Sequence, residues 1–256
     1  MKPFLSVVIP AYNEETNIRL GALDKVACFM NGLSFGWEVL LVDDGSTDGT
    51  KGLLDEFAVA NHGFRVIRSV HQGKALTVIA GVLAAKGGIV LFTDLDQATP
   101  IGEVEKLLPW FKKDLPAGRQ GFDVVIGSRS NRREGAPLTR RVMARGFMVL
   151  RSIFLGLHCI TDTQCGFKAF RKDVARDIFG RLKLYSEHRE VEGSMVTAGF
   201  DLEVLFLAKK VGYKIKEVSV EWHYVETRRV NPMKDSLQGL MDILKIRVNA
   251  WKGLYR

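Results

Sequence analysis

Two aspartates one residue apart, Asp94 and Asp96, follow a run of strand-forming residues in the segment LFTDLDQATP (91–100). A hard cation such as Mg²⁺ or Mn²⁺ binds a few carboxylates and completes its shell with substrate phosphate oxygens and water. Alternate residues of a strand point to opposite faces, but the chain turns at a strand end, so both carboxylates can converge. The pair therefore predicts a divalent-metal site, unless the two acids only open an ordinary loop.

Polar residues follow each of the other predicted strands in the first half as well. An aspartate after a strand is usually a helix N-cap, but ligands of open parallel sheets bind beyond the carboxyl ends of the strands. A metal at Asp94 and Asp96 would neutralise a departing diphosphate, and Asp43 and Asp44 could accept hydrogen bonds from a base or ribose. The joint placement indicates a binding site, and the remaining segments are PAYNE (10–14), DDGS (43–46), QGK (72–74) and GSR (127–129).

The elements that must position these residues alternate between strands and helices. This alternation predicts βαβ units, right-handed crossovers and an α/β fold with a mostly parallel sheet covered on both faces. Residues 114–121 read as a surface loop, and no linker divides the chain, so one domain is expected. The predicted strands are 5–12, 37–46, 64–70, 87–96 and 122–129, and the predicted helices are 14–30, 47–61, 74–86 and 102–112.

Several other functional classes lack their sequence signals. No G-x-G-x-x-G follows the first strand, HQGKALT lacks the upstream glycine of a P-loop, and no G-x-S-x-G is present. The five histidines show no metal-ligand spacing, and the three cysteines indicate neither a disulfide framework nor a zinc site. With no signal peptide and no apolar run long enough to span a bilayer, a reducing, cytoplasmic setting is expected.

The net charge of +8 is concentrated in the second half of the chain. Residues 129–151 contain seven arginines and one acid, and residues 228–256 contain seven basic residues and two acids. Segments 138–157 and 236–255 combine basic residues with apolar residues at helical spacing. They predict amphipathic helices that pack on the core, lie in a membrane interface, or do both. Phosphate-rich ligands, anionic lipids and nucleic acid are all compatible with this charge.

The motifs VVIPAYNEE, VDDGSTDGT, TDLD and GSR, in this order and spacing, resemble the family 2 glycosyltransferases of GT-A fold. The later segments DTQCGFKAF (162–170), FDLEVLFLA (200–208) and 217–247 are similar to the polyprenyl-phosphate branch. Within that branch the chain looks most like dolichyl-phosphate β-glucosyltransferases and is similar to dolichyl-phosphate mannosyltransferases. The resemblance covers nearly the whole chain, but these motifs do not specify the sugar.

The resemblance implies a role for each matching residue. It implies one GT-A domain, with residues 1–129 binding a nucleotide sugar and 130–256 serving the acceptor and the membrane. Asp94 and Asp96 would bind Mg²⁺ or Mn²⁺, with Asp96 the surer ligand, and Ala98 stands where mannosyltransferase relatives have a metal-binding Gln. Gln97 or water would then complete the metal shell. Pro10, Tyr12 and Glu14 would line the nucleotide pocket, Asp43 would hold the base, Lys74 would help to bind the donor, and Arg129 and Arg140 or Arg141 would contact phosphate groups.

The implied acceptor is a polyprenyl phosphate, which is largely dianionic at neutral pH because its second pKa is roughly 6. Such a nucleophile needs little help from a general base, and arginines would position it through forked hydrogen bonds. Inversion at the anomeric carbon would give a β-linked lipid-phosphate hexose, glucose being favoured over mannose. Asp201 and Glu203 are candidates for contacts to the sugar hydroxyls, or else a helix cap and a surface acid.

Two rival functions stay open at this point. A soluble or polysaccharide hydroxyl acceptor would need a genuine base, for which Asp201 or Glu203 is available. A non-enzymatic nucleic-acid-binding module would explain the basic second half, but no nucleic-acid motif is present and the acidic edge would repel a phosphate backbone. We therefore expect no nucleic-acid partner, and peripheral association with the cytoplasmic face of a membrane without a spanning segment.

Overall fold

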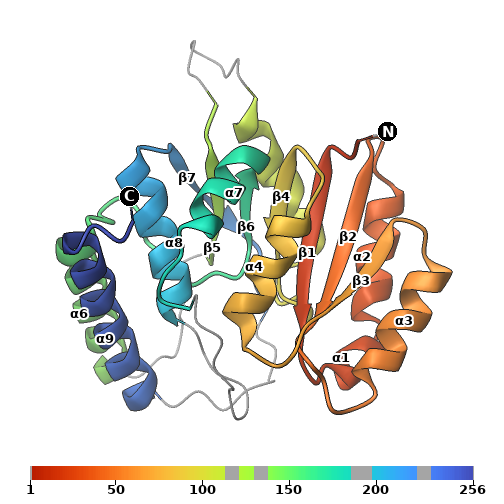
Figure 1. Ribbon diagram of the computed structural model, residues 1–256, viewed down its shortest axis with the longest axis horizontal. Coiled ribbons are helices and arrows are strands. Elements are labelled where there is room, and N and C mark those ends of the chain that lie inside the picture. The colour runs from red at the N-terminus through yellow and green to blue at the C-terminus, as the bar shows by residue number, and fades with distance from the viewer. Residues whose placement is uncertain (1, 113–120, 130–137, 186–197, 224–231, 256) are drawn as a thin grey trace.

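In the computed structural model of the protein, the structure is described for residues 2–112, 121–129, 138–185, 198–223 and 232–255. Within these residues seven strands form one sheet in the order β3-β2-β1-β4-β6-β5-β7 (Figure 1). All neighbours are parallel except β6, which runs antiparallel to β4 and β5. The strands are β1 (Leu5–Ala11), β2 (Trp37–Asp43), β3 (Phe64–Arg68), β4 (Ile89–Phe92), β5 (Val124–Arg129), β6 (Lys168–Arg171) and β7 (Ile215–Val220).

Helices cover both faces of the sheet. One face packs mainly against α4, α7, α8 and α9, and the other packs against α1, α2, α3 and α5. The central strands β1, β2 and β4 are almost wholly buried, as their largely continuous apolar sequences predict, whereas β3 and β7 at the two edges of the sheet are only partly buried. The helices are α1 (Glu15–Arg19), α2 (Ala22–Asn31), α3 (Thr50–Ala60), α4 (Lys74–Ala84), α5 (Val104–Leu107), α6 (Leu138–Leu155), α7 (Lys172–Gly180), α8 (Ala198–Val211) and α9 (Pro232–Trp251).

The structure corrects two of the predicted helices. The helix expected over 14–30 is two helices, because Gly21 adopts a left-handed conformation (φ 80°) that ends one and begins the next. The helix expected over 102–112 consists of α5 flanked by two 3₁₀ turns, η1 (Ile101–Glu103) and η2 (Leu108–Phe111), and Pro109 lies in the second turn. The predicted helices of the second half correspond to α6 and α9.

The strand prediction is incomplete in the second half. The five predicted strands are confirmed as β1 to β5, with shorter ends. However, β6 and β7 were not predicted, and β6 makes the sheet mixed rather than wholly parallel. Because β6 lies antiparallel between β4 and β5, these two strands still point the same way, and their carboxyl ends meet at one edge. The mostly parallel α/β fold is confirmed.

Candidate active site

The carboxyl ends of β1, β2, β4 and β5 bring most of the predicted site residues to one edge of the sheet (Figure 1). Ala11, the last residue of β1, is in register with Asp43, the last residue of β2. Asp94 is the second residue after β4, and Arg129 is the last residue of β5. The backbone therefore places these residues at the carboxyl ends of the strands, as the sequence predicted.

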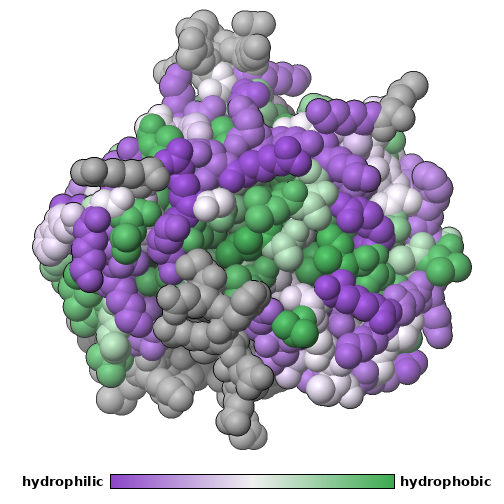
Figure 2. Space-filling model, viewed as in Figure 1, coloured by the Kyte–Doolittle hydropathy of each residue, from purple (hydrophilic) through white to green (hydrophobic). Residues whose placement is uncertain are grey.

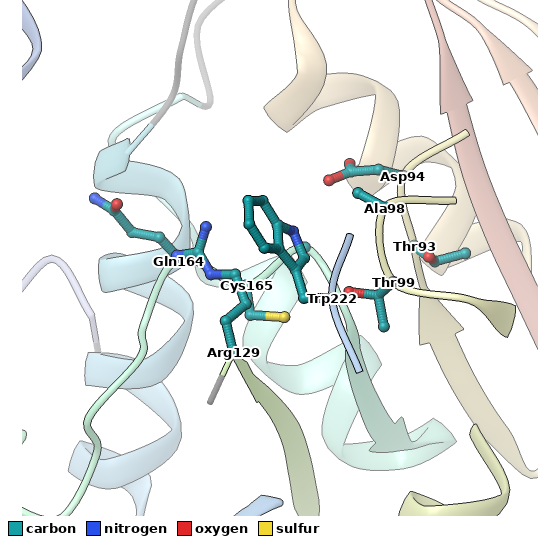
Figure 3. Close-up of a pocket in the computed structure, with 9 residues that line it drawn as sticks. Thr93, Asp94, Ala98, Thr99, Arg129, Gln164, Cys165 and Trp222 are labelled. Carbon is teal, nitrogen blue, oxygen red and sulfur yellow. The ribbon is translucent and has the colours of Figure 1, made fainter. Parts of the chain in front are cut away.

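A pocket lies between the end of β4 and the segment before β6 (Figure 3). Asp94 and Ala98 form one side of it, and Arg129 and Trp222 approach from β5 and from the segment after β7. The carboxylate of Asp94 also forms an ion pair with Lys74, the first residue of α4. Lys74 and Asp94, both predicted to bind the donor, thus meet at the mouth of the pocket. The other residues that line the pocket are Thr93, Thr99, Gln164, Cys165 and Gly166.

The loop after β4 is a tight turn that fixes the two aspartates. Asp96 Oδ1 accepts a hydrogen bond from the backbone N–H of Ala98 at 3.0 Å. Gln97 has φ 53°, and its side chain donates to Asp94 O and accepts from the N–H of Ile101, each at 3.0 Å. Gln97 is buried in these contacts, so its amide serves the turn and is not turned to the pocket. The expectation that Gln97 might replace the missing ligand at Ala98 is not supported.

Gly166 packs directly beneath the carboxylate of Asp94. A Cβ atom at this position would come closer than 3.0 Å to the Asp94 side chain. The absence of a side chain at Gly166 therefore permits Asp94 to occupy its present place. This contact brings the segment before β6 against the loop after β4.

The end of β2 carries two aspartates with different surroundings. Asp44 is buried and accepts hydrogen bonds from the backbone N–H groups of Gln72 and Gly73, each at 2.9 Å. It therefore holds the turn that leads to Lys74. Asp43 is equally buried, but only its Oδ1 has a partner among the described residues, the N–H of Ser46 at 3.1 Å. Asp43 Oδ2 is a buried acceptor without a partner in that part of the chain.

An aromatic stack lies beside these aspartates. The rings of Tyr12 and His71 are parallel within 10°, with centroids 3.9 Å apart. His71 Nδ1 lies 2.9 Å from Asp44 Oδ2, so the stack is anchored to the end of β2. Pro10 in β1 and Glu14 just after it are half-buried on the same segment as Tyr12.

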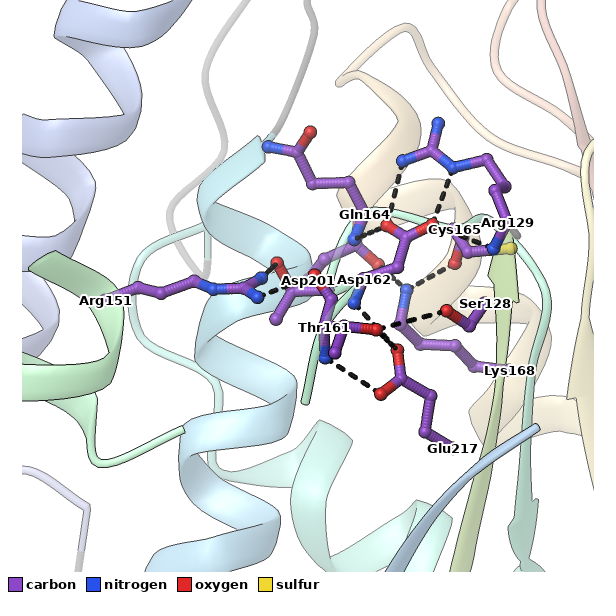
Figure 4. Close-up of polar contacts among 11 residues, drawn as sticks. Ser128, Arg129, Arg151, Thr161, Asp162, Gln164, Cys165, Lys168, Asp201 and Glu217 are labelled. Atoms are coloured by element: carbon purple, nitrogen blue, oxygen red, sulfur yellow. Dashed lines mark hydrogen bonds and ion pairs between the residues drawn. The ribbon is translucent and has the colours of Figure 1, made fainter. Parts of the chain in front are cut away.

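Arg129 is held by Asp162 in a forked contact (Figure 4). Its Nε and Nη2 donate to the two carboxylate oxygens at 2.7 and 2.8 Å, and its backbone N–H donates to Oδ2 at 3.1 Å. Burial would raise the pKa of Asp162, but the hydrogen bonds from Arg129 outweigh it and hold this pKa below its usual value. The pair keeps Arg129 charged and fixes its guanidinium at the pocket.

A second layer of contacts holds the segment that carries Asp162. Glu217 on β7 accepts from the N–H groups of Thr161 and Asp162 at 2.8 and 2.7 Å. Arg151 on α6 donates to the carbonyl oxygens of Ile160 and Thr161, both at 2.7 Å (Figure 4). Together with Arg129 on β5, side chains from α6 and β7 therefore position one loop.

The two candidate bases on α8 are both engaged in other contacts. Asp201 accepts from the Nζ of Lys168 at 2.5 Å, and Lys168 is fully buried. Glu203 is also fully buried and accepts from Tyr255 Oη at 2.6 Å and from the N–H groups of Lys183 and Leu184. Burial raises the pKa of Glu203. It is neither a surface acid nor a lining residue of the pocket, and Asp201 also lies outside the pocket lining.

Comparison with known proteins identifies the family. A model described as Glycosyl transferase family 2 matches residues 6–179. This chain belongs to glycosyltransferase family 2. It is 35% identical to the dolichyl-phosphate β-glucosyltransferase of Saccharomyces cerevisiae, over 99% of this chain and 77% of that protein. It is 31% identical to the protein of the same name in Homo sapiens, over 98% of this chain and 77% of that protein.

Solved structures show that this glycosyltransferase has the GT-A fold expected from its sequence. Mannosyl-3-phosphoglycerate synthase from Rubrobacter xylanophilus matches with a TM-score of 0.64 and 18% identity, over 98% of this chain and 75% of that one. Glucosyl-3-phosphoglycerate synthase from Mycobacterium tuberculosis, solved with Mn²⁺, UDP-glucose and phosphoglyceric acid, matches with a TM-score of 0.59. Its identity is 20%, over 96% of this chain and 80% of that one.

Sequence reasoning did not assign roles to several residues of the candidate site. Asp162, Gln164 and Cys165 belong to the motif DTQCGFKAF, which supported the family resemblance but received no role. Trp222 lies in the segment after β7, and a lone tryptophan gives no signal of its own. Arg140 and Arg141 lie on α6, but their side chains are outside the described part of the chain. Their predicted contact with the acceptor phosphate stays a prediction.

Proposed function

We propose that this chain transfers glucose from a nucleotide sugar, UDP-glucose, to a polyprenyl phosphate of the dolichyl type, giving a β-linked product. The observation that most directly supports this proposal is a pocket at the carboxyl ends of the strands, which both the Asp94 carboxylate and the fixed Arg129 guanidinium line. Acidic and cationic groups at one pocket suit a metal-bound diphosphate and a phosphate acceptor. The names of relatives that match over nearly the whole chain support the same reaction.

The donor nucleotide would bind at the ends of β1 and β2. Asp43 Oδ2 is a buried acceptor without a described partner, which would be costly unless a ligand donor satisfied it. An N–H group of the base would supply that donor. Tyr12, stacked on His71, would form an aromatic wall beside the base, with Pro10 and Glu14 completing this side of the pocket. Residues 1–129 would thus form the donor half and 130–256 the acceptor half.

A divalent cation fits the residues after β4. No group of three or more His, Cys, Asp or Glu side chains that could hold a metal occurs among the described residues. Asp94 and Asp96 are both partly exposed oxygen donors, and Asp94 already pairs with the cationic Lys74. These two carboxylates would hold Mg²⁺ or Mn²⁺, whose remaining ligands would be diphosphate oxygens and water. When bound, the cation would stabilise the charge of the leaving UDP.

The transfer would be a single displacement. A phosphate oxygen of the acceptor forms the new bond to the anomeric carbon, while the bond from that carbon to the UDP oxygen breaks with its electron pair. The configuration inverts from α to β. Arg129, held in place by Asp162, would orient a phosphate group by forked hydrogen bonds. Because the acceptor is already anionic, no proton has to be removed.

The engagement of the two candidate bases disfavours a hydroxyl acceptor. Such an acceptor would have to lose a proton, and the carboxylates considered for that task are Asp201 and Glu203. Asp201 is ion-paired with a buried lysine, and Glu203 is buried beneath Tyr255. Neither carboxylate lines the pocket formed by the described residues.

A lipid acceptor requires the protein to reach a membrane surface. No helix in the described part of the chain is long and apolar enough to cross a membrane. In Figure 1 helix α9 begins toward the same end of the molecule as the carboxyl end of β1, and it carries a row of exposed apolar side chains three or four residues apart. We assign this row, the α9 stripe, to peripheral contact with the cytoplasmic face of a membrane. It comprises Leu237, Met241, Leu244, Val248 and Trp251.

A donor and acceptor panel tests the proposed function. Purified protein is offered UDP- and GDP-sugars with a polyprenyl phosphate, with and without Mn²⁺, and the glycolipid product is measured. Turnover is expected with UDP-glucose and is expected to be abolished by a chelator and restored by Mn²⁺. Turnover only with a hydroxyl acceptor would overturn the proposal, and turnover undiminished by the chelator would overturn the metal assignment.

A further inference from the structure

Trp222 places a partly exposed indole ring in the pocket beside the reacting groups. Figure 3 shows the ring between Arg129 on one side and the loop of Asp94 and Ala98 on the other. Its exposed fraction is 41%, and the guanidinium carbon of Arg129 lies 5.7 Å from the ring centroid. A partly exposed aromatic ring that lines a polar pocket can contact a ligand bound there.

The backbone on both sides of Trp222 is fixed to the loop that follows Asp96. The N–H of Glu221 donates to Glu103 Oε2 at 2.9 Å, and the N–H of His223 donates to the carbonyl oxygen of Ala98 at 2.8 Å. Glu103 is itself buried and paired with Lys106. These contacts join the segment after β7 to the metal-binding loop, so the indole ring has a defined place relative to Asp94.

The side chains that line the pocket indicate which part of the two substrates the pocket would hold. A prenyl chain would need apolar walls, whereas this lining contains Asp94, Thr99, Arg129 and Gln164. In the proposed function the nucleotide base binds elsewhere, beside Asp43 at the end of β2 and Tyr12 just after β1. A hexose has an apolar face of C–H groups and a rim of hydroxyls, which match one aromatic wall and several polar side chains. Ala98, with its small side chain, leaves room between the indole and the loop.

We propose that Trp222 is the platform on which the glucosyl group of the donor stacks, with Gln164 and Thr99 available to its hydroxyls. This inference rests on the proposed function, because it presumes a nucleotide sugar as donor. It assigns a donor-specificity residue that the sequence motifs did not indicate. The ring would hold the hexose near Asp94 and orient its anomeric carbon for attack.

The test compares the binding of UDP-glucose with the binding of UDP by calorimetry in the presence of Mn²⁺. Trp222→Ala is expected to weaken UDP-glucose binding about 10-fold, because one aromatic contact is lost, and to leave UDP binding within about 2-fold. Trp222→Phe should retain most of the affinity, whereas Trp222→Leu, which keeps an apolar side chain without a ring, should not. Phe4→Ala, which removes a ring of similar exposure just before β1, is the matched control and should change neither affinity.

Retained UDP binding shows that a variant is folded. An equal loss for UDP and UDP-glucose in Trp222→Ala would overturn the platform, as would a change confined to the KM for the polyprenyl phosphate. These outcomes leave the proposed function intact if the wild-type protein still glucosylates the lipid. Failure of the wild-type protein to turn over any nucleotide sugar would instead overturn the proposed function.

Discussion

Arg129 is fixed by Asp162 before any phosphate arrives. The contact uses both carboxylate oxygens and is partly buried, so the arginine need not be ordered when a substrate binds. Asp162 itself is anchored by Glu217, which accepts its backbone N–H. The aspartate is thus a positioning residue whose effect should be expressed through Arg129.

Asp162→Asn should raise the KM for the acceptor or the donor phosphate about 10-fold, because the amide no longer provides two acceptors for the arginine fork. Arg129→Ala should raise this KM further, and the double variant should have a KM no higher than that of Arg129→Ala alone. Steady-state kinetics with both substrates measure this. Asp177→Asn on α7 breaks another aspartate–arginine pair at 2.7 Å and is the control. Additive losses in the double variant would contradict a positioning role.

The sequence was sufficient to place the candidate site residues that lie at or just after a strand end, and insufficient to place the others. Asp43, Asp94 and Arg129 lie at the carboxyl ends of the strands because each stands at or within two residues of the end of a strand. In contrast, the Asp162 contact and the placement of Trp222 depend on where β6 and β7 join the sheet. The sequence left open whether Gln97 or water completes the metal shell, because the part that Gln97 plays in the turn depends on a positive φ that the sequence did not reveal.

At the scale of elements, α8 and α9 enclose two buried acids. Glu203 on α8 bonds to Tyr255, and Asp242 on α9 accepts from Gln238 at 2.9 Å. Burial raises the pKa of both carboxyls. A raised pKa means that the folded state binds the proton more tightly than the unfolded state. Their contribution to stability is therefore complete below the usual carboxyl pKa and is lost as the pH rises through the raised values.

The melting temperature is therefore expected to fall as the pH rises from 5 to 8, and Glu203→Gln should reduce this fall. If the pKa of one carboxyl differs by one between the folded and unfolded states, the free energy of unfolding changes by about 1.4 kcal/mol. For a chain of this size, each kcal/mol shifts the melting temperature by roughly 2–4 °C. Thermal unfolding followed by circular dichroism at each pH measures the slope. Glu56→Gln on the exposed side of α3 is the control. An unchanged slope in Glu203→Gln would contradict this assignment.

Elements with strong alternation of strand and helix signals were predictable, and those defined by tertiary contacts were not. The buried strand β4 is four apolar residues in a row, and its sequence alone indicated a covered sheet. The short strand β6 contains Lys168 and Arg171, which are unusual in a central strand. Lys168 is tolerated there because Asp201 and the carbonyl oxygen of Cys165 satisfy its ammonium group.

At the scale of the whole molecule, apolar and basic side chains share one edge. Apolar and polar side chains mix at the left edge of the molecule in Figure 2, over α6 and α9, which pack together. The α9 stripe is accompanied by Val149 and Ile153 on α6. Between 237 and 254 the basic residues are Lys245, Arg247 and Lys252, and the single acid is the buried Asp242. Apolar groups with a cationic surround suit an anionic lipid surface.

The protein should therefore bind vesicles that contain anionic lipid, and two variants should lose this binding for different reasons. Replacing Leu244, Val248 and Trp251 by Ser removes apolar contact and should abolish binding even at low salt. Replacing Lys245, Arg247 and Lys252 by Gln should weaken binding on the order of 100-fold, since each charge contributes about 1 kcal/mol near such a surface. Co-sedimentation at two salt concentrations measures both effects.

The control for vesicle binding replaces two exposed apolar residues on the opposite side of the molecule, Leu20 and Val59, by Ser. This variant should sediment like the wild-type protein. Turnover of a short, water-soluble polyprenyl phosphate should be unchanged in the α9 stripe variant, because the stripe lies outside the pocket. A stripe variant that still binds vesicles would exclude the lipid contact. If the same substitutions instead converted a dimer into a monomer in sedimentation velocity, the stripe would belong to an interface between two copies.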